Sequence, residues 1–311
     1  MTMQPILIGT RGSRLALAQA ETVRARIARA MGGDHLAKLE VITTSGDRIQ
    51  DRTLTEIGGK GLFTLEIEQA LLSGRIQCAI HSLKDMPAEG PAGLTLAAIP
   101  EREDPRDAFL SVGHKTLAEL PAGAILGTAS LRRQAQSLHD RPDLGIVNLR
   151  GNVDTRIAKM QAGEADAILL AMAGLNRLGL AHHASGAIDP VQSPPAPGQG
   201  ALAIQSRIED ADAPWLEAVR DPATTLAVAA ERGALVALEG SCKTAIGAYA
   251  TLDGDRLTLI VEALTPRGER RFRRTGEVDV GGVGGEARAR QLGLDLGRSI
   301  HAEAGEDLFA S

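Results

Sequence analysis

The chain has 311 residues, which is more than one hydrophobic core usually supports, so we expect two or three domains. It carries a formal net charge of −5 and contains one Trp, one Tyr and four Phe. This composition argues against a nucleic-acid-binding protein, because it offers neither a broad basic surface nor many aromatic side chains for base stacking.

The sequence shows no targeting signal and no membrane span. Residues 1–8 are typical of a strand and lack a basic flank followed by a long apolar segment. No apolar run reaches the length of a transmembrane helix. We therefore expect a cytoplasmic protein that does not bind membranes, in a reducing compartment where disulfides are rare.

Strands and helices alternate through the first two thirds of the chain. The expected elements of the first part are strand 6–9, helix 15–31, strand 38–44, helix 66–72 and strand 78–82. Those of the middle are strand 124–127, helix 131–138, strand 145–149, helix 155–162, strand 167–171 and helix 175–180. Such alternation is typical of mostly parallel sheets with helices on both faces.

A loop rich in Pro and Gly, residues 192–200, marks a change of pattern and a plausible crossing between domains. The elements expected after it are helix 224–238, strands 246–252, 257–263 and 270–278, and helix 286–304. Turn signals between the strands indicate antiparallel pairing. The last third of the chain is therefore predicted to form a small α+β domain.

Arginines follow three of the predicted strands, in or near the first turn of the next helix, where a hydroxyl, Asn or Asp offers an N-cap. A helix N-terminus is already partly positive, so a cation there is unfavourable unless an anion is present. The carboxyl ends of parallel strands are also where α/β proteins usually bind ligands. We therefore predict an anionic ligand, although each arginine alone could face solvent or pair with a nearby acid. The residues are Arg11 with Ser13, then Arg132 and Arg133 with Thr128 and Ser130, and finally Arg150 and Arg156.

Lys60 stands among three glycines in the segment 58–63, which predicts a mobile loop with exposed backbone donors. The segment is not a Walker P-loop, because the four-residue gap and the Ser or Thr after the lysine are missing. Nucleotide binding is therefore not the favoured interpretation.

His81, Lys84 and Asp85 end an apolar strand before Pro87. In a continued strand Lys84 and Asp85 would face opposite sides, whereas a turn could direct both into a cleft. An ionised Asp85 among cations could stabilise a developing positive charge. The alternatives are a surface Lys-Asp turn and a structural role for His81.

The two cysteines occur in different settings. Cys78 lies in an apolar stretch and is typical of a small core side chain. Cys242 follows a predicted helix end and precedes Lys243, and a neighbouring cation favours the thiolate that a covalent attachment point needs. The alternative is an ordinary loop cysteine. No set of residues has the spacing of a metal site, so no metal is expected.

Together these motifs resemble one family, porphobilinogen deaminase, also called hydroxymethylbilane synthase. The resembling segments occur in family order and span nearly the whole chain. They are IGTRGSRLALAQA (8–20), SGDRIQD (45–51), GGKGLF (58–63), AIHSLKDMP (79–87), GTASLRRQAQ (127–136), NLRGNVDTR (148–156), AGLNRLGL (173–180), PAPGQGALAIQ (195–205) and GSCKTAIGAYA (240–250).

The resemblance implies an α/β protein with two domains like those of periplasmic binding proteins, each with a mixed, mostly parallel sheet. A small C-terminal α+β domain with an antiparallel three-stranded sheet would follow. Domain 1, catalytic and substrate-binding, would comprise residues 1–99 and 200–219, since the chain returns to it after the Gln199 loop. Domain 2, for cofactor and polypyrrole binding, would be 100–199, and domain 3, with the cofactor cysteine, 220–311.

The resemblance also implies the reaction. Four porphobilinogen molecules would be joined head to tail, with loss of ammonia, on a dipyrromethane cofactor attached to Cys242 through a thioether. Hydrolysis would then release hydroxymethylbilane. Asp85 would stabilise positive charge on pyrrole nitrogens, Lys60 and Phe63 would belong to a loop that covers the cleft, and Gln199 would lie at its hinge side.

Other roles follow residue by residue from the matching motifs. The catalytic set would be Asp85, Lys84, Arg11 and Gln199. Cofactor contacts would come from Cys242, Asp85, Lys84, Ser130, Arg132, Arg133, Thr128, Ser13 and Asp47. Substrate contacts would come from Arg11, Arg150, Arg156, Lys60, Phe63 and Arg177. Each pyrrole carries acetate and propionate groups, so these cations would have carboxylates to bind.

A rival interpretation is a non-catalytic two-domain binding protein for an acidic small molecule. Cys242 and the third domain argue against it. A phosphate-handling transferase that uses Lys60 is a weaker alternative, because no nucleotide or metal motif accompanies the lysine. Porphobilinogen is the expected small-molecule partner, the protein is expected to be a monomer, and a transient hand-over of product to uroporphyrinogen III synthase is possible.

Overall fold

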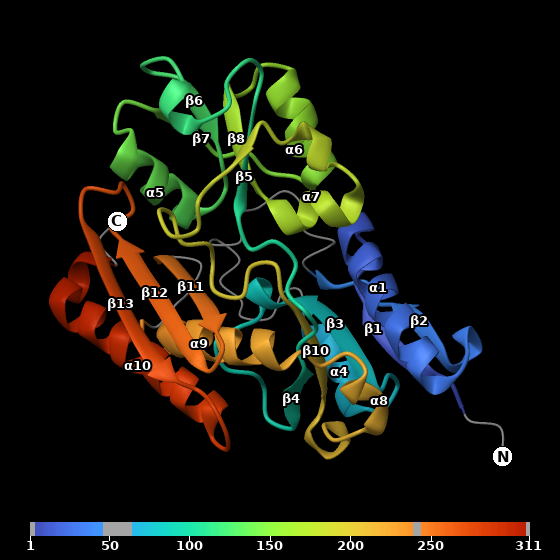
Figure 1. Cartoon of the computed structure of the whole chain (residues 1–311). Helices are drawn as coiled ribbons and strands as arrows, with labels where there is room; N and C mark the ends of the chain where they lie inside the picture. The colour runs from blue at the N-terminus through green and yellow to red at the C-terminus, as the bar shows by residue number, and fades with distance from the viewer. Residues whose placement is uncertain (1–3, 46–63, 239–243, 309–311) are drawn as a thin grey trace. The chain divides into compact units, whose positions relative to one another are not determined.

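The computed structural model describes residues 4–45, 64–238 and 244–308 (Figure 1). The chain divides into two compact units, and each is built from two separate stretches of sequence. Unit 1 comprises Met1–Arg102 and Ala201–Thr225, and unit 2 comprises Glu103–Gly200 and Leu226–Ser311. The three-domain division expected from the sequence stays a prediction.

Unit 1 contains a five-stranded mixed sheet in the order β2-β1-β3-β10-β4. Its strands are β1 (Ile6–Thr10), β2 (Ala37–Val41), β3 (Cys78–Ser82), β4 (Leu94–Ala98) and β10 (Leu202–Arg207). Four strands run in one direction, because β1 pairs in parallel with β2 and β3, while β10 pairs antiparallel with both β3 and β4. The return of the chain after Gln199 therefore inserts β10 between β3 and β4 of the first sheet.

Helices cover both faces of this sheet, as the α/β pattern predicts (Figure 1). Helix α1 (Arg14–Met31) buries Val23 and Ile27 against Ile8 and Ile80 of the strands. The remaining helical segments of unit 1 are η1 (Asp34–Leu36), α4 (Leu65–Leu72), η2 (Leu83–Asp85), η5 (Ile208–Asp210) and α8 (Pro214–Glu217). Helix α4 packs in a second cluster that includes Ala79 of β3.

Unit 2 repeats this architecture with the strand order β7-β6-β8-β5-β9. The strands are β5 (Asp107–Ser111), β6 (Ile125–Gly127), β7 (Gly145–Val147), β8 (Ala167–Ala171) and β9 (Gly186–Ala187). Four again run in one direction, with β5 opposed to β8 and β9. The associated helical segments are η3 (Leu117–Glu119), α5 (Leu131–Asp140), α6 (Val153–Gln161), α7 (Met172–Leu178) and η4 (Ala181–His183). The expectation of mixed, mostly parallel sheets is confirmed for both units.

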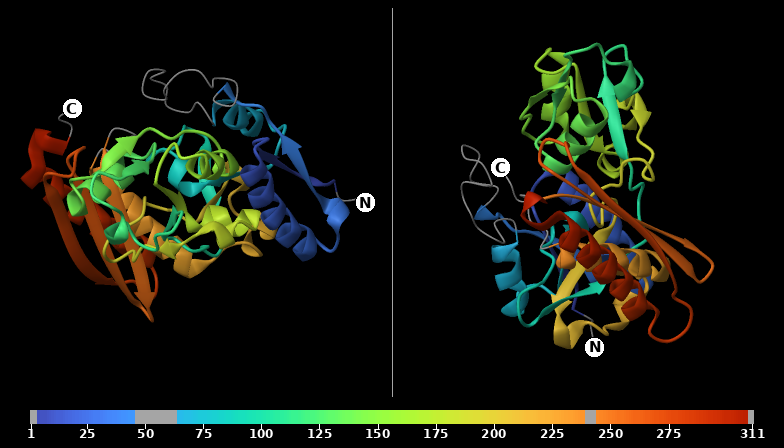
Figure 2. Two further views of the ribbon diagram at one scale, coloured as in Figure 1. Left: turned by 90° about the horizontal axis from the view of Figure 1, so that it is seen from above. Right: turned by 90° about the vertical axis from the view of Figure 1, so that its left-hand side faces the viewer.

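The end of the chain forms the expected antiparallel sheet, in the order β11-β12-β13. Its elements are α9 (Pro222–Ala237), β11 (Ala245–Asp253), β12 (Arg256–Leu264), β13 (Arg271–Asp279), α10 (Gly285–Ala304) and η6 (Gly305–Leu308). Figure 2 shows α10 lying along this sheet, and residues of α9, α10 and the three strands share one apolar core. Helices α9 and α10 approach closely, since a Cβ added at Gly293 would stand 1.9 Å from the carbonyl oxygen of Ala230.

A buried carboxylate ties this sheet to the loop before β10. Glu231 on α9 has no exposed surface and accepts the backbone N–H of Gly198 at 2.7 Å and that of Ala250 at 2.9 Å. Both donors belong to unit 2, like Glu231 itself. Glu231 thus supplies partners for two backbone groups that would otherwise be costly to bury.

Candidate active site

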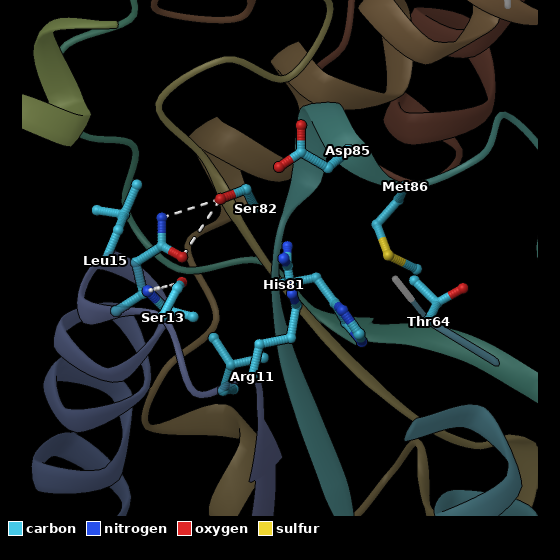
Figure 3. A pocket seen from close by; sticks show the side chains of 11 residues that line it. Arg11, Ser13, Leu15, Thr64, His81, Ser82, Asp85 and Met86 are labelled. Atoms are coloured by element: carbon cyan, nitrogen blue, oxygen red, sulfur yellow. Dashed lines mark hydrogen bonds between the residues drawn. The ribbon is translucent and has the colours of Figure 1, made fainter. Parts of the chain in front are cut away.

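Unit 1 contains a cavity of about 90 Å³ where β1 and β3 end (Figure 3). Its lining combines a cation, a carboxylate, hydroxyls and an amide with a few apolar side chains. The lining residues are Arg11, Ser13, Leu15, Ala16, Gln19, Thr64, Ile80, His81, Ser82, Asp85 and Met86. The structure therefore brings Arg11, Ser13 and Asp85, three of the predicted site residues, together around one cavity.

Arg11 and Ser13 are held by the turn between β1 and α1. Ser13 is the N-cap of α1, and its hydroxyl accepts the backbone N–H of Ala16 at 3.2 Å, as the sequence predicted. No acidic residue occupies the first turn of this helix. A helix N-terminus and a guanidinium group thus lie at the same cavity, which favours an anionic ligand there.

Asp85 reaches the cavity because the chain turns after β3. The strand ends at Ser82, and Leu83–Asp85 form the short helix η2. Asp85 is exposed and is the one carboxylate among the described lining residues, whereas Lys84 is half-buried and outside the lining. The predicted turn is confirmed, but it brings only Asp85 to this cavity.

Two further polar side chains border Asp85. The hydroxyl of Ser82 accepts a hydrogen bond from Nε2 of Gln19 at 2.9 Å, which links β3 to α1. His81 is 7% exposed, and burial lowers the pKa of its imidazole to about 4. His81 is therefore neutral at physiological pH and adds no positive charge to that of Arg11.

Arg132 and Arg133 were expected to bind the carboxylates of a ligand. In unit 2 they form a buried ion-pair cluster with Asp107. Asp107 lies 2.8 Å from Nη1 of Arg132, 2.8 Å from Nη2 of Arg133 and 2.8 Å from Nε2 of Gln199. Burial alone would raise the pKa of Asp107, but the two guanidinium groups outweigh it and hold that pKa well below its usual range. Sequence reasoning missed Asp107.

The cluster uses the two arginines differently. Arg133 donates from Nε and Nη2 to Asp107 and from Nη1 to the carbonyl oxygen of Leu169. Nη1 of Arg132 contacts Asp107, Gln136 and the carbonyl oxygen of Pro194, while its buried Nε has no hydrogen-bond partner. Arg132, Arg133 and Asp107 together carry a net positive charge, which the buried Glu262 partly offsets at Arg132.

The remaining predicted residues of unit 2 lie at or next to helix ends. Ser130 caps α5 by accepting the N–H of Arg133 at 3.4 Å, and Oγ1 of Thr128 accepts the N–H of Ser130 at 3.1 Å. Arg150 is exposed, while Nε of Arg156 donates to the carbonyl oxygen of Gly151 at 2.8 Å. A further donor lies in α7, where Nη2 of Arg177 contacts the carbonyl oxygen of Gly200 at 2.7 Å.

The sequence can now be compared with known proteins. Residues 6–214 match the family model "Porphobilinogen deaminase, dipyromethane cofactor binding domain", and residues 225–302 match "Porphobilinogen deaminase, C-terminal domain". The chain belongs to the porphobilinogen deaminase family. Porphobilinogen deaminase from Caulobacter sp. (strain K31) is 65% identical over 99% of both chains. The protein of the same name from Phenylobacterium zucineum is 60% identical over 98% of this chain and 99% of its own.

These matches confirm the family expected from the sequence. They also confirm the expected hydroxymethylbilane synthase activity, which is a transferase activity, and the expected dipyrromethane cofactor. The rival interpretation as a non-catalytic binding protein is not supported by these matches. Among solved structures, a periplasmic substrate-binding protein of an ABC transporter from Coxiella burnetii aligns over 70% of this chain and 93% of its own. With a TM-score of 0.43 and 14% identity, this alignment adds no support to the fold assignment.

Several predictions fall on residues that lie outside the described part of the chain: Asp47, Lys60, Phe63 and Cys242. Their roles as family residues stay predictions. Cys78, by contrast, is described and fully buried, and burial raises the pKa of its thiol, which confirms it as a core side chain. Within residues 4–45, 64–238 and 244–308, no cluster of His, Cys, Asp and Glu could hold a metal ion, and no helix is suited to cross a membrane.

The Asp107 cluster should stabilise unit 2. Replacing Asp107 with Asn would leave two buried guanidinium groups without their carboxylate, at a cost of about 3–5 kcal/mol. The pKa of Asp107 is depressed in the folded state, so its contribution is fully present above the unfolded value near 4 and is lost progressively as pH falls from there through the much lower folded pKa. Urea unfolding should show the full loss of stability in the variant at pH 7 and a loss smaller by about 1 kcal/mol at pH 3.

A matched control for this experiment is Asp143→Asn, which removes a more exposed carboxylate 2.7 Å from Arg141. Its unfolding midpoint at pH 7 should stay close to that of the wild type, because exposed ion pairs contribute little. Equal effects of the two substitutions would show that the Asp107 cluster is not the stabilising feature described above.

Proposed function

We propose that the cavity in unit 1 binds porphobilinogen and that Asp85 acts on its nitrogen atoms during deamination and coupling. The overall reaction is the head-to-tail polymerisation of four porphobilinogen molecules with loss of ammonia, followed by hydrolytic release of hydroxymethylbilane. The observation that carries the proposal is the meeting of Arg11, the N-terminus of α1 and Asp85 at one cavity. This arrangement suits a substrate that bears both carboxylates and nitrogen.

The chain's own groups have distinct tasks in this proposal. Arg11 and the N-terminus of α1 bind the acetate or propionate of the substrate. Asp85, as a carboxylate, stabilises the positive charge that develops when ammonia leaves, and it holds a proton when the pyrrole carbon loses one. Lys84 and Gln199 complete the proposed catalytic set.

We propose Cys242 as the point of attachment of the dipyrromethane. When bound, this group supplies the terminal pyrrole carbon that accepts each new unit. The positive Asp107 cluster fits its acidic side chains, and the unpartnered Nε of Arg132 is consistent with a missing acceptor. The proposed contacts are Ser13, Asp47, Lys84, Asp85, Thr128, Ser130, Arg132 and Arg133.

The remaining cations are proposed to bind the growing chain. These substrate contacts are Arg11, Arg150, Arg156, Arg177, Lys60 and Phe63. We further propose that the protein works as a monomer in the cytoplasm and passes its product transiently to uroporphyrinogen III synthase. The proposed domains are residues 1–99 with 200–219, 100–199 and 220–311.

A direct assay tests the reaction. Purified protein incubated with porphobilinogen should release ammonia and hydroxymethylbilane in a ratio of about four to one, as head-to-tail condensation of four substrate molecules requires. The protein itself should react with an acidic aldehyde reagent, which reports covalently bound pyrroles. Absence of both ammonia and the coloured product would contradict the proposal.

Arginine variants should separate cofactor assembly from elongation. Arg11→Ala removes the guanidinium of the unit 1 cavity, so it should block cofactor assembly and yield protein without added pyrrole mass. Arg156→Ala should retain the cofactor and stall at intermediate masses in native mass spectrometry. The control Arg298→Ala removes a cation whose side chain is 65% exposed and should behave as wild type. Wild-type rates in both site variants would place carboxylate binding elsewhere.

A further inference from the structure

A second buried carboxylate of unit 2 lies on the C-terminal sheet. Val261 and Ala263 of β12 belong to the apolar core shared with α9 and α10. Glu262 stands between them, so it points to the opposite face of the sheet, where it is only 1% exposed. Helix α5 packs on that face, since its Ala135 shares a small apolar cluster with Leu264 of β12.

Two arginines of β13 and one glutamine of α5 surround the Glu262 carboxylate. Arg273 lies directly opposite Glu262 in the sheet and Arg271 is two residues away from Arg273, so the three side chains share a face. Oε2 of Glu262 accepts from Nε of Arg271 at 2.5 Å and from Nη1 of Arg273 at 3.4 Å. Oε1 accepts from Nε2 of Gln136 at 3.0 Å, so both oxygens of the buried carboxylate are used.

Gln136 extends this network to Arg132. Oε1 of Gln136 accepts a hydrogen bond from Nη1 of Arg132 at 2.8 Å, while Nε2 donates to Glu262 and to the carbonyl oxygen of Pro194. A carboxylate can only accept and a guanidinium can only donate. The amide of Gln136 is therefore fixed from both sides, with its NH₂ group toward Glu262 and its oxygen toward Arg132.

We propose that Glu262 and Gln136 are positioning residues that fix the guanidinium of Arg132, so that its Nε–H is presented to a carboxylate of the dipyrromethane. Nη1 of Arg132 donates to Asp107 and Gln136, both at 2.8 Å, and to the carbonyl oxygen of Pro194 at 3.3 Å. Nε of the same planar group is buried and has no hydrogen-bond partner among the described residues. A guanidinium held from several sides at one nitrogen keeps its remaining donors in a fixed direction.

This inference deepens the proposed function and rests on it, because Arg132 must be a contact of the cofactor. The charges agree with it. Burial lowers the pKa of Arg132, whereas the carboxylates of Asp107 and Glu262 act in the opposite direction and favour the protonated guanidinium that a carboxylate ligand needs. The competing explanation is that Glu262 only neutralises the two arginines of β13.

The substitutions Glu262→Gln and Gln136→Met remove the two links separately. A glutamine at 262 must turn its NH₂ group toward Gln136 or toward the arginines, so one acceptor is lost. Methionine at 136 has a similar length but cannot donate to Glu262. Each substitution should lower kcat by about three- to tenfold, the change that corresponds to one hydrogen bond. KM for porphobilinogen should stay nearly unchanged, because the proposed cofactor is covalently attached and does not depend on substrate concentration.

The double variant separates a relay from a structural role. Both residues act on Arg132 in series, so Glu262→Gln should cause no further loss of kcat in the Gln136→Met background. Glu277→Gln is the matched control, because it removes an exposed carboxylate of the same sheet, and it should behave as wild type. Additive effects in the double variant, or wild-type kcat in either single variant, would overturn the proposal.

Nitrogen-15 NMR of arginine-labelled holoenzyme tests the positioning without turnover. The Nε–H signal of Arg132 is the one absent from Arg132→Lys. Its exchange with water should be about three- to tenfold faster in Glu262→Gln and in Gln136→Met than in the wild type. The Nε–H of Arg133, which donates to Asp107 at 3.1 Å, should not change. Equal acceleration at both arginines would indicate general loosening of unit 2 and would contradict the inference.

The variant Arg132→Lys separates failure of the inference from failure of the proposed function. Lysine has no Nε–H donor in a planar group. If Arg132→Lys carries the full dipyrromethane mass and turns over normally, Arg132 is not a cofactor contact and both proposals fail. If Arg132→Lys loses cofactor or turnover while Glu262→Gln and Gln136→Met behave as wild type, the inference alone fails.

Discussion

The variant Asp85→Asn should fold normally and lose turnover by roughly a hundred- to a thousandfold or more. Asn retains the size of the side chain but not the charge that stabilises a cationic pyrrole. Asp85 is exposed and lies in a short helical turn, so its replacement leaves the apolar core of unit 1 untouched. Single-turnover kinetics of ammonia release, on protein that already carries its cofactor, would measure the loss in the chemical step.

Two controls make the interpretation of Asp85→Asn specific. Asp85→Glu keeps the charge with displaced geometry and should retain part of the activity. Glu89→Gln removes an exposed carboxylate a few residues away, outside the described cavity lining, and should leave turnover unchanged. Near-normal turnover by Asp85→Asn would reject the role proposed for this carboxylate.

The second large effect is expected at Cys242. Cys242→Ser should yield folded protein that lacks the normal thioether-linked dipyrromethane and makes no hydroxymethylbilane at a useful rate. A thiolate is a far better nucleophile than a serine hydroxyl, and Lys243 favours the thiolate form. Intact mass and the acidic aldehyde reaction, compared between variant and wild type, would measure the loss of the group.

Cys78→Ser is the matched control for this experiment. Cys78 is fully buried in β3, so the substitution buries a hydroxyl and should lower the free energy of unfolding by about 1–3 kcal/mol without removing the cofactor. Full activity of Cys242→Ser would reject the attachment site. A pyrrole adduct on Cys78 would show that the cofactor is attached to Cys78 and not to Cys242.

Elements whose own sequence is strongly patterned were predicted well. The bounds of β3 and β8 agree residue for residue with the strands expected at 78–82 and 167–171, because each is a short, largely apolar run. The caps Ser13 and Ser130 were also correct, since capping depends on residues three positions away or fewer.

Features that depend on distant partners were not predicted. The local pattern around β10 did not indicate a strand, and its Gln205 and Ser206 are buried only because β3 and β4 lie on either side. Asp107 accepts hydrogen bonds from Arg132, Arg133 and Gln199. These residues are distant in sequence and are brought to Asp107 by the fold. Local propensity contains no information about such pairings, so the sequence alone left pairing with an acid as an alternative and could not name Asp107 as the partner.

Native mass spectrometry of the purified wild-type protein during turnover tests the central claim most directly. Before substrate is added, the mass should equal that of the polypeptide plus two linked pyrrole units on the peptide containing Cys242. Porphobilinogen should then produce successive increments, each equal to one substrate less one ammonia, and the starting mass should return as product is released. An active preparation with unmodified Cys242, or one that forms product without such increments, would contradict the account.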